Sequence, residues 1–141
     1  MKNLIILFSL ILSFTSCIQN EEERINDNSI VGTWKLVENF VDTSLENNGE
    51  WKSVENGYIY TFMLDGTFYS NKFPETTQGT YNLTDVLLTL EFNCNDFSSG
   101  FFETPNGTLV ESYRIINNEL FLSPRYVICE GCLWKFKKVA E

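Results

Sequence analysis

The sequence predicts an all-β domain in which eight strands form an antiparallel up-and-down barrel. After residue 29, helical spacing is nearly absent, and short runs of β-branched and aromatic residues alternate with Gly, Asn and Asp. Three connections consist of tight-turn residues, which force antiparallel neighbours. The other connections are longer and alternate with the tight turns, so they gather at one end, the mouth of the barrel. Closing eight strands into a barrel leaves no exposed sheet edge.

The first four expected strands are separated by one tight turn and two long connections. Asp65–Gly66 joins the second strand to the third, because both residues adopt positive φ at little cost. Residues 40–56 and 73–78 are the long connections. The four strands are residues 31–39 (VGTWKLVEN), 57–64 (GYIYTFML), 67–72 (TFYSNK) and 79–83 (GTYNL).

The last four expected strands continue the same alternation of connections. Thr84–Asp85 and Asn117–Asn118 are tight turns, whereas residues 93–107 and 124–131 are long. The strands between them are again rich in β-branched and aromatic residues. They are residues 86–92 (VLLTLEF), 108–116 (TLVESYRII), 119–123 (ELFLS) and 132–138 (CLWKFKK).

The turn at Asp65–Gly66 has two interpretations. A two-residue loop would place Phe62 and Phe68 on opposite faces of the sheet. A three-residue loop that begins at Leu64, with a bulge at the glycine, pairs both rings on one face. We favour the second, because it buries both phenylalanines, each worth roughly 1.5–3 kcal/mol when buried.

Alternation of side chains along each strand predicts which residues face the interior. A barrel of eight strands is just wide enough to be filled by side chains or to hold one small ligand, and both outcomes stay open. At the Asn117–Asn118 turn, a two-residue loop pairs Ile115 with Leu120 and Tyr113 with Leu122. We expect Leu88, Ile115, Leu120 and Leu122 to complete the interior around a ligand site formed by Trp34, Leu36, Tyr60, Phe62, Phe68, Tyr81, Leu90, Phe92, Tyr113, Trp134 and Phe136.

The chain begins with the pattern of an export signal. Lys2 precedes an apolar run that is shorter than the roughly 20 residues of a membrane-spanning helix, and small polar residues lead into Cys17. "FTSC" resembles the lipobox of bacterial lipoproteins. That resemblance implies that residues 1–16 are a signal peptide and that Cys17 carries acyl chains such as palmitate. Residues 17–29 are polar and acidic, so we expect a flexible tether before a domain of residues 30–141.

The lipobox places the expected protein in the bacterial cell envelope, as an outer-membrane lipoprotein facing the periplasm or the cell surface. Removal of residues 1–16 leaves 125 of the 141 residues, which suits one domain. Loss of Lys2 takes the formal net charge from −9 to −10. Such an acidic chain is not expected to bind nucleic acid, and the acyl chains rather than basic residues would hold it on a membrane.

Three further cysteines, Cys94, Cys129 and Cys132, lie at the expected mouth. Disulfides persist in exported proteins, so we expect one bridge and one spare thiol, with the pairing left open. The "CEGC" segment lacks the neighbouring helix of a thioredoxin-like redox pair. A zinc site wants four ligands, whereas the chain offers three thiols and no histidine. We therefore expect no metal and no cofactor.

The segment "IVGTWKLVE", from Ile30 to Glu38, carries Gly-x-Trp on the first strand. With "YTFMLDGTFYS", "YRIINNELFLS" and "CLWKFKKV" in register, it resembles the lipocalins, in particular short lipocalin-like domains of Bacteroidetes lipoproteins. The resemblance covers residues 30–139 and implies a barrel whose base is plugged by Trp34 and whose cup takes a small apolar ligand. It also implies a basic residue stacked on Trp34, but Lys135 and Lys137 face outward.

The residue inventory argues against an enzyme. Without histidine, Ser-His-Asp and Cys-His arrangements are excluded, and the commonest general base is missing. The chain also has no glycine-rich phosphate loop. The acidic residues cluster in the tether and in loops, where solvated faces are the simpler interpretation.

Two functions remain. The first is a tethered binding module that takes a small apolar or amphipathic ligand in the mouth. The second is an interaction module with a filled barrel, which would contact a protein or glycan of the envelope through exposed rings. Both rest on aromatic residues in the expected loops: Phe40, Phe73, Phe97 and the four rim residues Trp51, Phe101, Phe102 and Tyr126.

Overall fold

The computed structural model describes residues 29–41, 49–94, 96–98, 105–125 and 131–139. These residues form nine strands and no helix, and none of them belongs to a helix long and apolar enough to cross a membrane. The strands are β1 (Gly32–Val41), β2 (Glu50–Ser53), β3 (Ile59–Phe62), β4 (Thr67–Phe73), β5 (Thr76–Leu83), β6 (Leu87–Phe92), β7 (Thr108–Ile116), β8 (Glu119–Pro124) and β9 (Leu133–Lys138).

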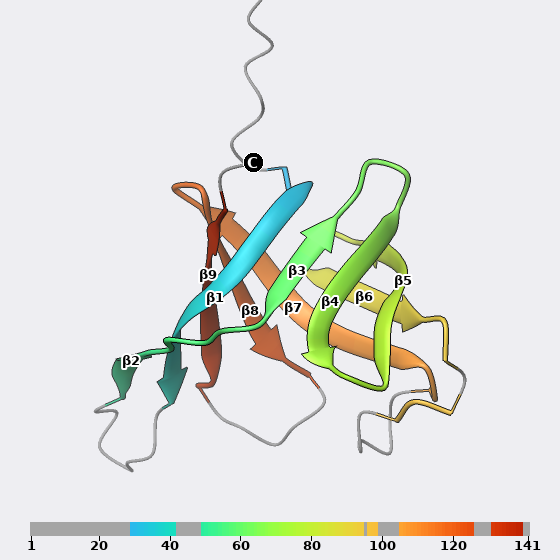
Figure 1. Cartoon of the computed structure of the whole chain (residues 1–141). Helices are drawn as coiled ribbons and strands as arrows, with labels where there is room; N and C mark the ends of the chain where they lie inside the picture. The colour runs from blue at the N-terminus through green and yellow to red at the C-terminus, as the bar shows by residue number, and fades with distance from the viewer. Residues whose placement is uncertain (1–28, 42–48, 95, 99–104, 126–130, 140–141) are drawn as a thin grey trace, which may run out of the picture.

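The strands form one antiparallel sheet that closes on itself. From β3 to β9 each strand pairs with the next, β1 pairs with β3, and β1 also pairs with β9 (Figure 1). Eight strands therefore make a closed up-and-down barrel, which confirms the predicted fold class. The β3–β4 and β7–β8 turns lie at its upper end in Figure 1, the base, and the β4–β5 turn lies at its lower end, the mouth.

Two expected connections have a different structure. Residues 40–56 were expected to form one long connection, but β1 continues to Val41 and β2 pairs back onto it, with Phe40 opposite Trp51. Residues 73–78 were also expected to be long, but only Pro74 and Glu75 separate β4 from β5. The predicted alternation of long and short connections is therefore wrong between β4 and β5. This connection is short because β5 begins already at Thr76.

The turn between β3 and β4 has the favoured three-residue form. Phe62 pairs with Phe68, and the amide of Met63 donates to the carbonyl of Thr67 at 2.9 Å. Gly66 supplies the positive φ, 82°, that the bulge requires. Asp65 accepts hydrogen bonds from the amide and hydroxyl of Thr67, which lowers the pKa of its carboxyl.

The other two tight turns also follow the sequence closely. Asn117 and Asn118 have φ values of 51° and 59°, so the predicted two-residue turn pairs Ile115 with Leu120. After β5 the loop is one residue longer than expected, because β6 begins at Leu87. Thr84 pairs with Leu87, and Val86, expected within the next strand, lies in the turn and is 61% exposed.

The base of the barrel is built around Trp34, which is fully buried. Its indole Nε1 donates to the carbonyl of Ile30 at 2.7 Å, so the indole's one polar group is satisfied. The Lys138 ammonium lies 5.3 Å from the centre of the ring, so the last strand does supply a stacked cation, although neither Lys135 nor Lys137 provides it. Gly32 has a φ of 126°, a conformation that L side chains rarely adopt, so this position favours glycine.

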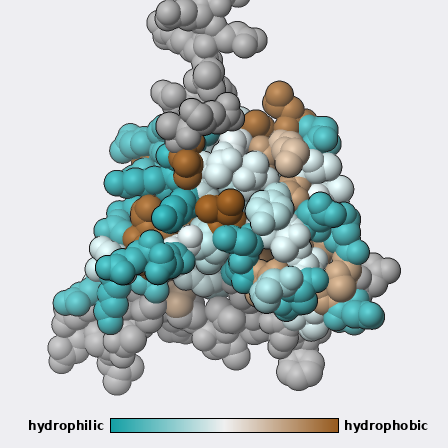
Figure 2. Space-filling view, viewed as in Figure 1, coloured by the Kyte–Doolittle hydropathy of each residue, from teal (hydrophilic) through white to brown (hydrophobic). Residues whose placement is uncertain are grey.

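Aromatic rings pack against one another inside the barrel from the base toward the mouth. Tyr60 and Phe62 stack with their rings 5.5 Å apart, and Phe92 meets Phe68 edge to face at 5.1 Å. Phe97, expected in a rim loop, is buried and packs on Phe92 at 4.6 Å. The face that carries β1, β3 and β4 is mostly polar or intermediate in hydropathy, with scattered hydrophobic residues (Figure 2).

Candidate functional site

A buried ion pair lies near the mouth, inside the barrel. On β4 the residues that face inward are Phe68, Ser70 and Lys72, and on β7 they include Leu109 and Glu111. Lys72 Nζ lies 3.2 Å from Glu111 Oε1. Because β5 and β6 separate these two strands in the sheet, the pair bridges the barrel interior.

Among the described residues, four aromatic rings lie around the Lys72 ammonium. Its Nζ lies 4.5 Å from the ring centre of Trp134 on β9 and 5.0 Å from that of Tyr58, just before β3. Phe73 and Tyr60 follow at 5.4 Å and 5.9 Å. Each such cation–π contact is worth roughly 0.5–2 kcal/mol, more when water is excluded. The rings and Glu111 together hold the charge in one place.

The pair is removed from water. The Glu111 side chain is 0% exposed and that of Lys72 is 11% exposed. Burial lowers the pKa of Lys72, while the charge and hydrogen bond of Glu111 oppose that shift. Taking two charges out of water costs several kcal/mol per ion, so a buried pair is a poor way to stabilise a fold.

The second carboxylate oxygen of Glu111, Oε2, is the hydrogen-bond acceptor that the site offers to a bound molecule. Oε2 is buried and accepts no hydrogen bond from the described residues. A buried acceptor without a donor costs about 1–3 kcal/mol, and more when it is charged. A carboxylate oxygen that lies beside an aromatic surface can accept a hydrogen bond from a hydroxyl or amide group of a bound molecule.

The predicted interior residues come together in the barrel. Most are fully buried, and Tyr81, Tyr113, Ile115 and Trp134 are partly buried against the same core. These residues cannot all line one ligand site near the mouth, because Trp34 and Phe62 lie at the base. Of the residues expected to contact a ligand, Trp134 and Tyr60 place their rings near the Lys72 ammonium, and Phe136 packs 5.9 Å from Tyr60.

The ion pair was missed by sequence reasoning, although a signal was present. Strict alternation from Phe68 places Lys72 inward, and alternation back from Tyr113 places Glu111 inward. Charged residues are rarely fully buried, so both were left outside the predicted interior. Leu109 and Ile30, also buried, were missed with them.

The predicted rim and cysteine residues are only partly described. Trp51 lies on β2, packs against Phe40 at 5.4 Å and is 39% exposed. Cys94 is a free thiol packed against the core. A bridge between the other two expected cysteines stays a prediction. Cys17, Phe101, Phe102, Tyr126 and Cys129 lie outside the described residues.

Comparison with known proteins adds a fold likeness. The described strands form a closed eight-stranded up-and-down barrel with Trp34 buried at its base. Among solved structures, it is similar to a lipocalin-like protein from Bacteroides uniformis, with 18% sequence identity and a TM-score of 0.49. The match covers 77% of this chain and 97% of that one. No family model and no curated protein matches the chain.

Proposed function

We propose that this protein binds a small amphipathic molecule at the barrel mouth and performs no catalysis there. The unsatisfied, buried Oε2 of Glu111 carries the proposal. A hydroxyl or amide head group would donate to it, and the apolar body would lie against the rings that surround Lys72. A neutral donor suits the site best, because Lys72 already balances the charge of Glu111.

The same mouth offers a direct readout of binding. Trp134 contributes one of the rings around Lys72 and is only partly buried, so its fluorescence should respond to an occupant. We expect 1-decanol to change the emission saturably, and decanoate, which carries the wrong charge for Glu111, to bind at least tenfold more weakly. Trp134→Phe should abolish the signal and keep the binding, as measured by displacement of a fluorescent fatty alcohol.

Glu111→Gln separates the head-group contact from general apolar binding. The substitution keeps the shape but weakens the acceptor, so we expect the Kd of decanol to rise about tenfold. Circular dichroism checks that this variant is folded. If it is not folded, Trp134→Ala, which changes a partly buried residue, replaces it in the binding measurement.

If decanol leaves the emission of the unmodified protein unchanged and displaces no fluorescent fatty alcohol, the proposal of ligand binding is wrong. The alternative is then the filled barrel as an interaction module, which the outer ring contact of Phe40 with Trp51 favours.

We also propose that acyl chains on Cys17 hold the barrel on the membrane of the cell envelope. The support is the apolar run that ends at "FTSC", followed by acidic residues. In a bacterial host that processes lipoproteins, the full chain should fractionate with membranes, and Cys17→Ala should move most of it to the soluble fraction, because two or more acyl chains are needed for stable anchoring. Equal membrane retention of both forms would contradict acylation.

A further inference from the structure

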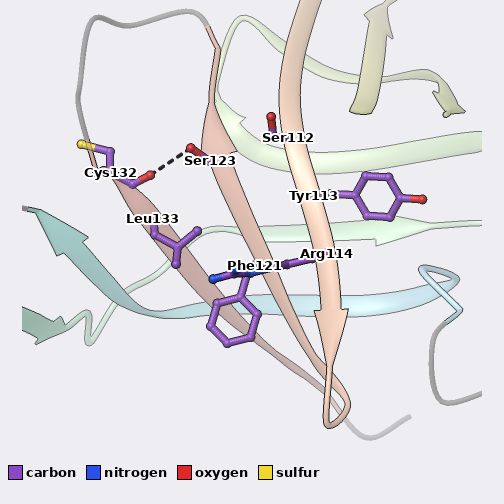
Figure 3. A pocket seen from close by; sticks show the side chains of 8 residues that line it. Ser112, Tyr113, Arg114, Phe121, Ser123, Cys132 and Leu133 are labelled. Atoms are coloured by element: carbon purple, nitrogen blue, oxygen red, sulfur yellow. Dashed lines mark hydrogen bonds between the residues drawn. The ribbon is translucent and has the colours of Figure 1, made fainter. Parts of the chain in front are cut away.

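A hollow opens on the outer wall of the barrel, beside the start of β9. It has a volume of about 290 Å³ and is lined by outward-facing residues of β7, β8 and β9, among them Ser112, Arg114, Phe121 and Leu133 (Figure 3). Tyr113, between Ser112 and Arg114, points its ring away from Phe121 and Leu133. The hollow therefore belongs to the outer wall.

The apolar side of the hollow is part of a continuous group of rings. Phe121 meets Trp51 edge to face at 6.2 Å, and Trp51 packs on Phe40 at 5.4 Å. Phe40 pairs with Leu133 across β1 and β9. Contacts among these rings limit their freedom, so the wall is already ordered before anything binds.

Among the described residues of β7, β8 and β9, Arg114 is an outward-facing cation that no carboxylate neutralises. Lys135 pairs with Glu38, and Lys137 lies 3.8 Å from Glu119. Among the described residues, Arg114 joins no salt bridge; its guanidinium lies 5.3 Å from the ring centre of Phe121. A guanidinium that stacks on a ring keeps its edge donors free for a carboxylate, which it can bind bidentately.

We propose that this hollow is a second binding site, for a small carboxylate with an apolar body. Arg114 would bind the carboxylate, the Ser112 hydroxyl would add a hydrogen bond, and the body would lie against Phe121 and Leu133. The Ser123 hydroxyl donates to the carbonyl of Cys132 at 3.0 Å and fixes the neighbouring wall (Figure 3). A volume near 290 Å³ is at the lower end for ligand pockets, so the molecule is small.

The test compares 4-phenylbutyrate with 4-phenylbutanol, which has the same ring and chain but no charge. Titration calorimetry at low salt should show saturable binding of the carboxylate and at least tenfold weaker binding of the alcohol. Arg114→Gln should weaken carboxylate binding about tenfold. Arg125→Gln is the matched control: it removes an exposed arginine just after β8 that does not line the hollow, and it should change the Kd less than twofold.

Three results would overturn the proposal. Equal weakening by the two arginine substitutions would mean attraction to general positive charge. Equal binding of the acid and the alcohol would leave Arg114 without a role. Displacement of 4-phenylbutyrate by 1-decanol would show that 4-phenylbutyrate binds in the mouth instead. If decanol does not bind at all, the proposed mouth site fails, but the proposal for the outer site does not depend on it.

Discussion

Replacing Trp34 with alanine is expected to lower the free energy of unfolding by about 3–5 kcal/mol. The side chain is fully buried at the base, so its removal leaves a cavity in a close-packed interior that relaxes only partly. The substitution also leaves the carbonyl of Ile30 without the indole donor and Lys138 without the ring beneath it. Urea denaturation followed by circular dichroism measures the loss.

Two further variants show where this loss arises. Trp34→Phe keeps most of the apolar volume but removes the Nε1 donor, so we expect a smaller loss of about 2 kcal/mol. Trp51→Ala removes a tryptophan of the outer face that is 39% exposed, and it should cost about 1 kcal/mol or less. Equal losses from Trp34→Ala and Trp51→Ala would contradict the role of Trp34 as the plug of the barrel.

The base of the barrel could be predicted because its signals are local. Gly32-x-Trp34 and the turn residues Gly66, Asn117 and Asn118 each fix a backbone conformation on their own. The order of tight turns then fixes which strands are neighbours. What local reasoning missed at the base is Lys138: its contact with Trp34 depends on the register of β1 against β9, which lie at opposite ends of the chain.

The mouth was harder to predict for a physical reason. Lys72 and Glu111 look like solvent-facing residues one at a time, because burying either charge alone is prohibitive. Only in the closed barrel do β4 and β7 face each other across the interior, so that the attraction between the two charges offsets the cost of burying them. The strand β2 escaped prediction similarly, since Glu50–Ser53 has exposed side chains throughout and depends on pairing with β1.

Replacing Lys72 with methionine is expected to lower the free energy of unfolding by about 3–5 kcal/mol, although methionine is apolar and similar in length. The change leaves the Glu111 carboxylate, 0% exposed, without its counter-charge. It also removes the cation from the rings of Trp134 and Tyr58. The matched control is Lys135→Met: Lys135 pairs with Glu38 on the outer face, where both side chains are partly exposed, and its loss should cost about 1 kcal/mol or less.

The double variant Lys72→Met with Glu111→Leu decides what the pair is for. If the cost of the single change is an uncompensated charge, removing both charges should restore stability to within about 1 kcal/mol of the original or raise it. A double variant as unstable as Lys72→Met alone would show that the pair itself holds the barrel together. A stable double variant that no longer binds 1-decanol would show the opposite: the fold tolerates an apolar mouth, and the buried charges serve recognition.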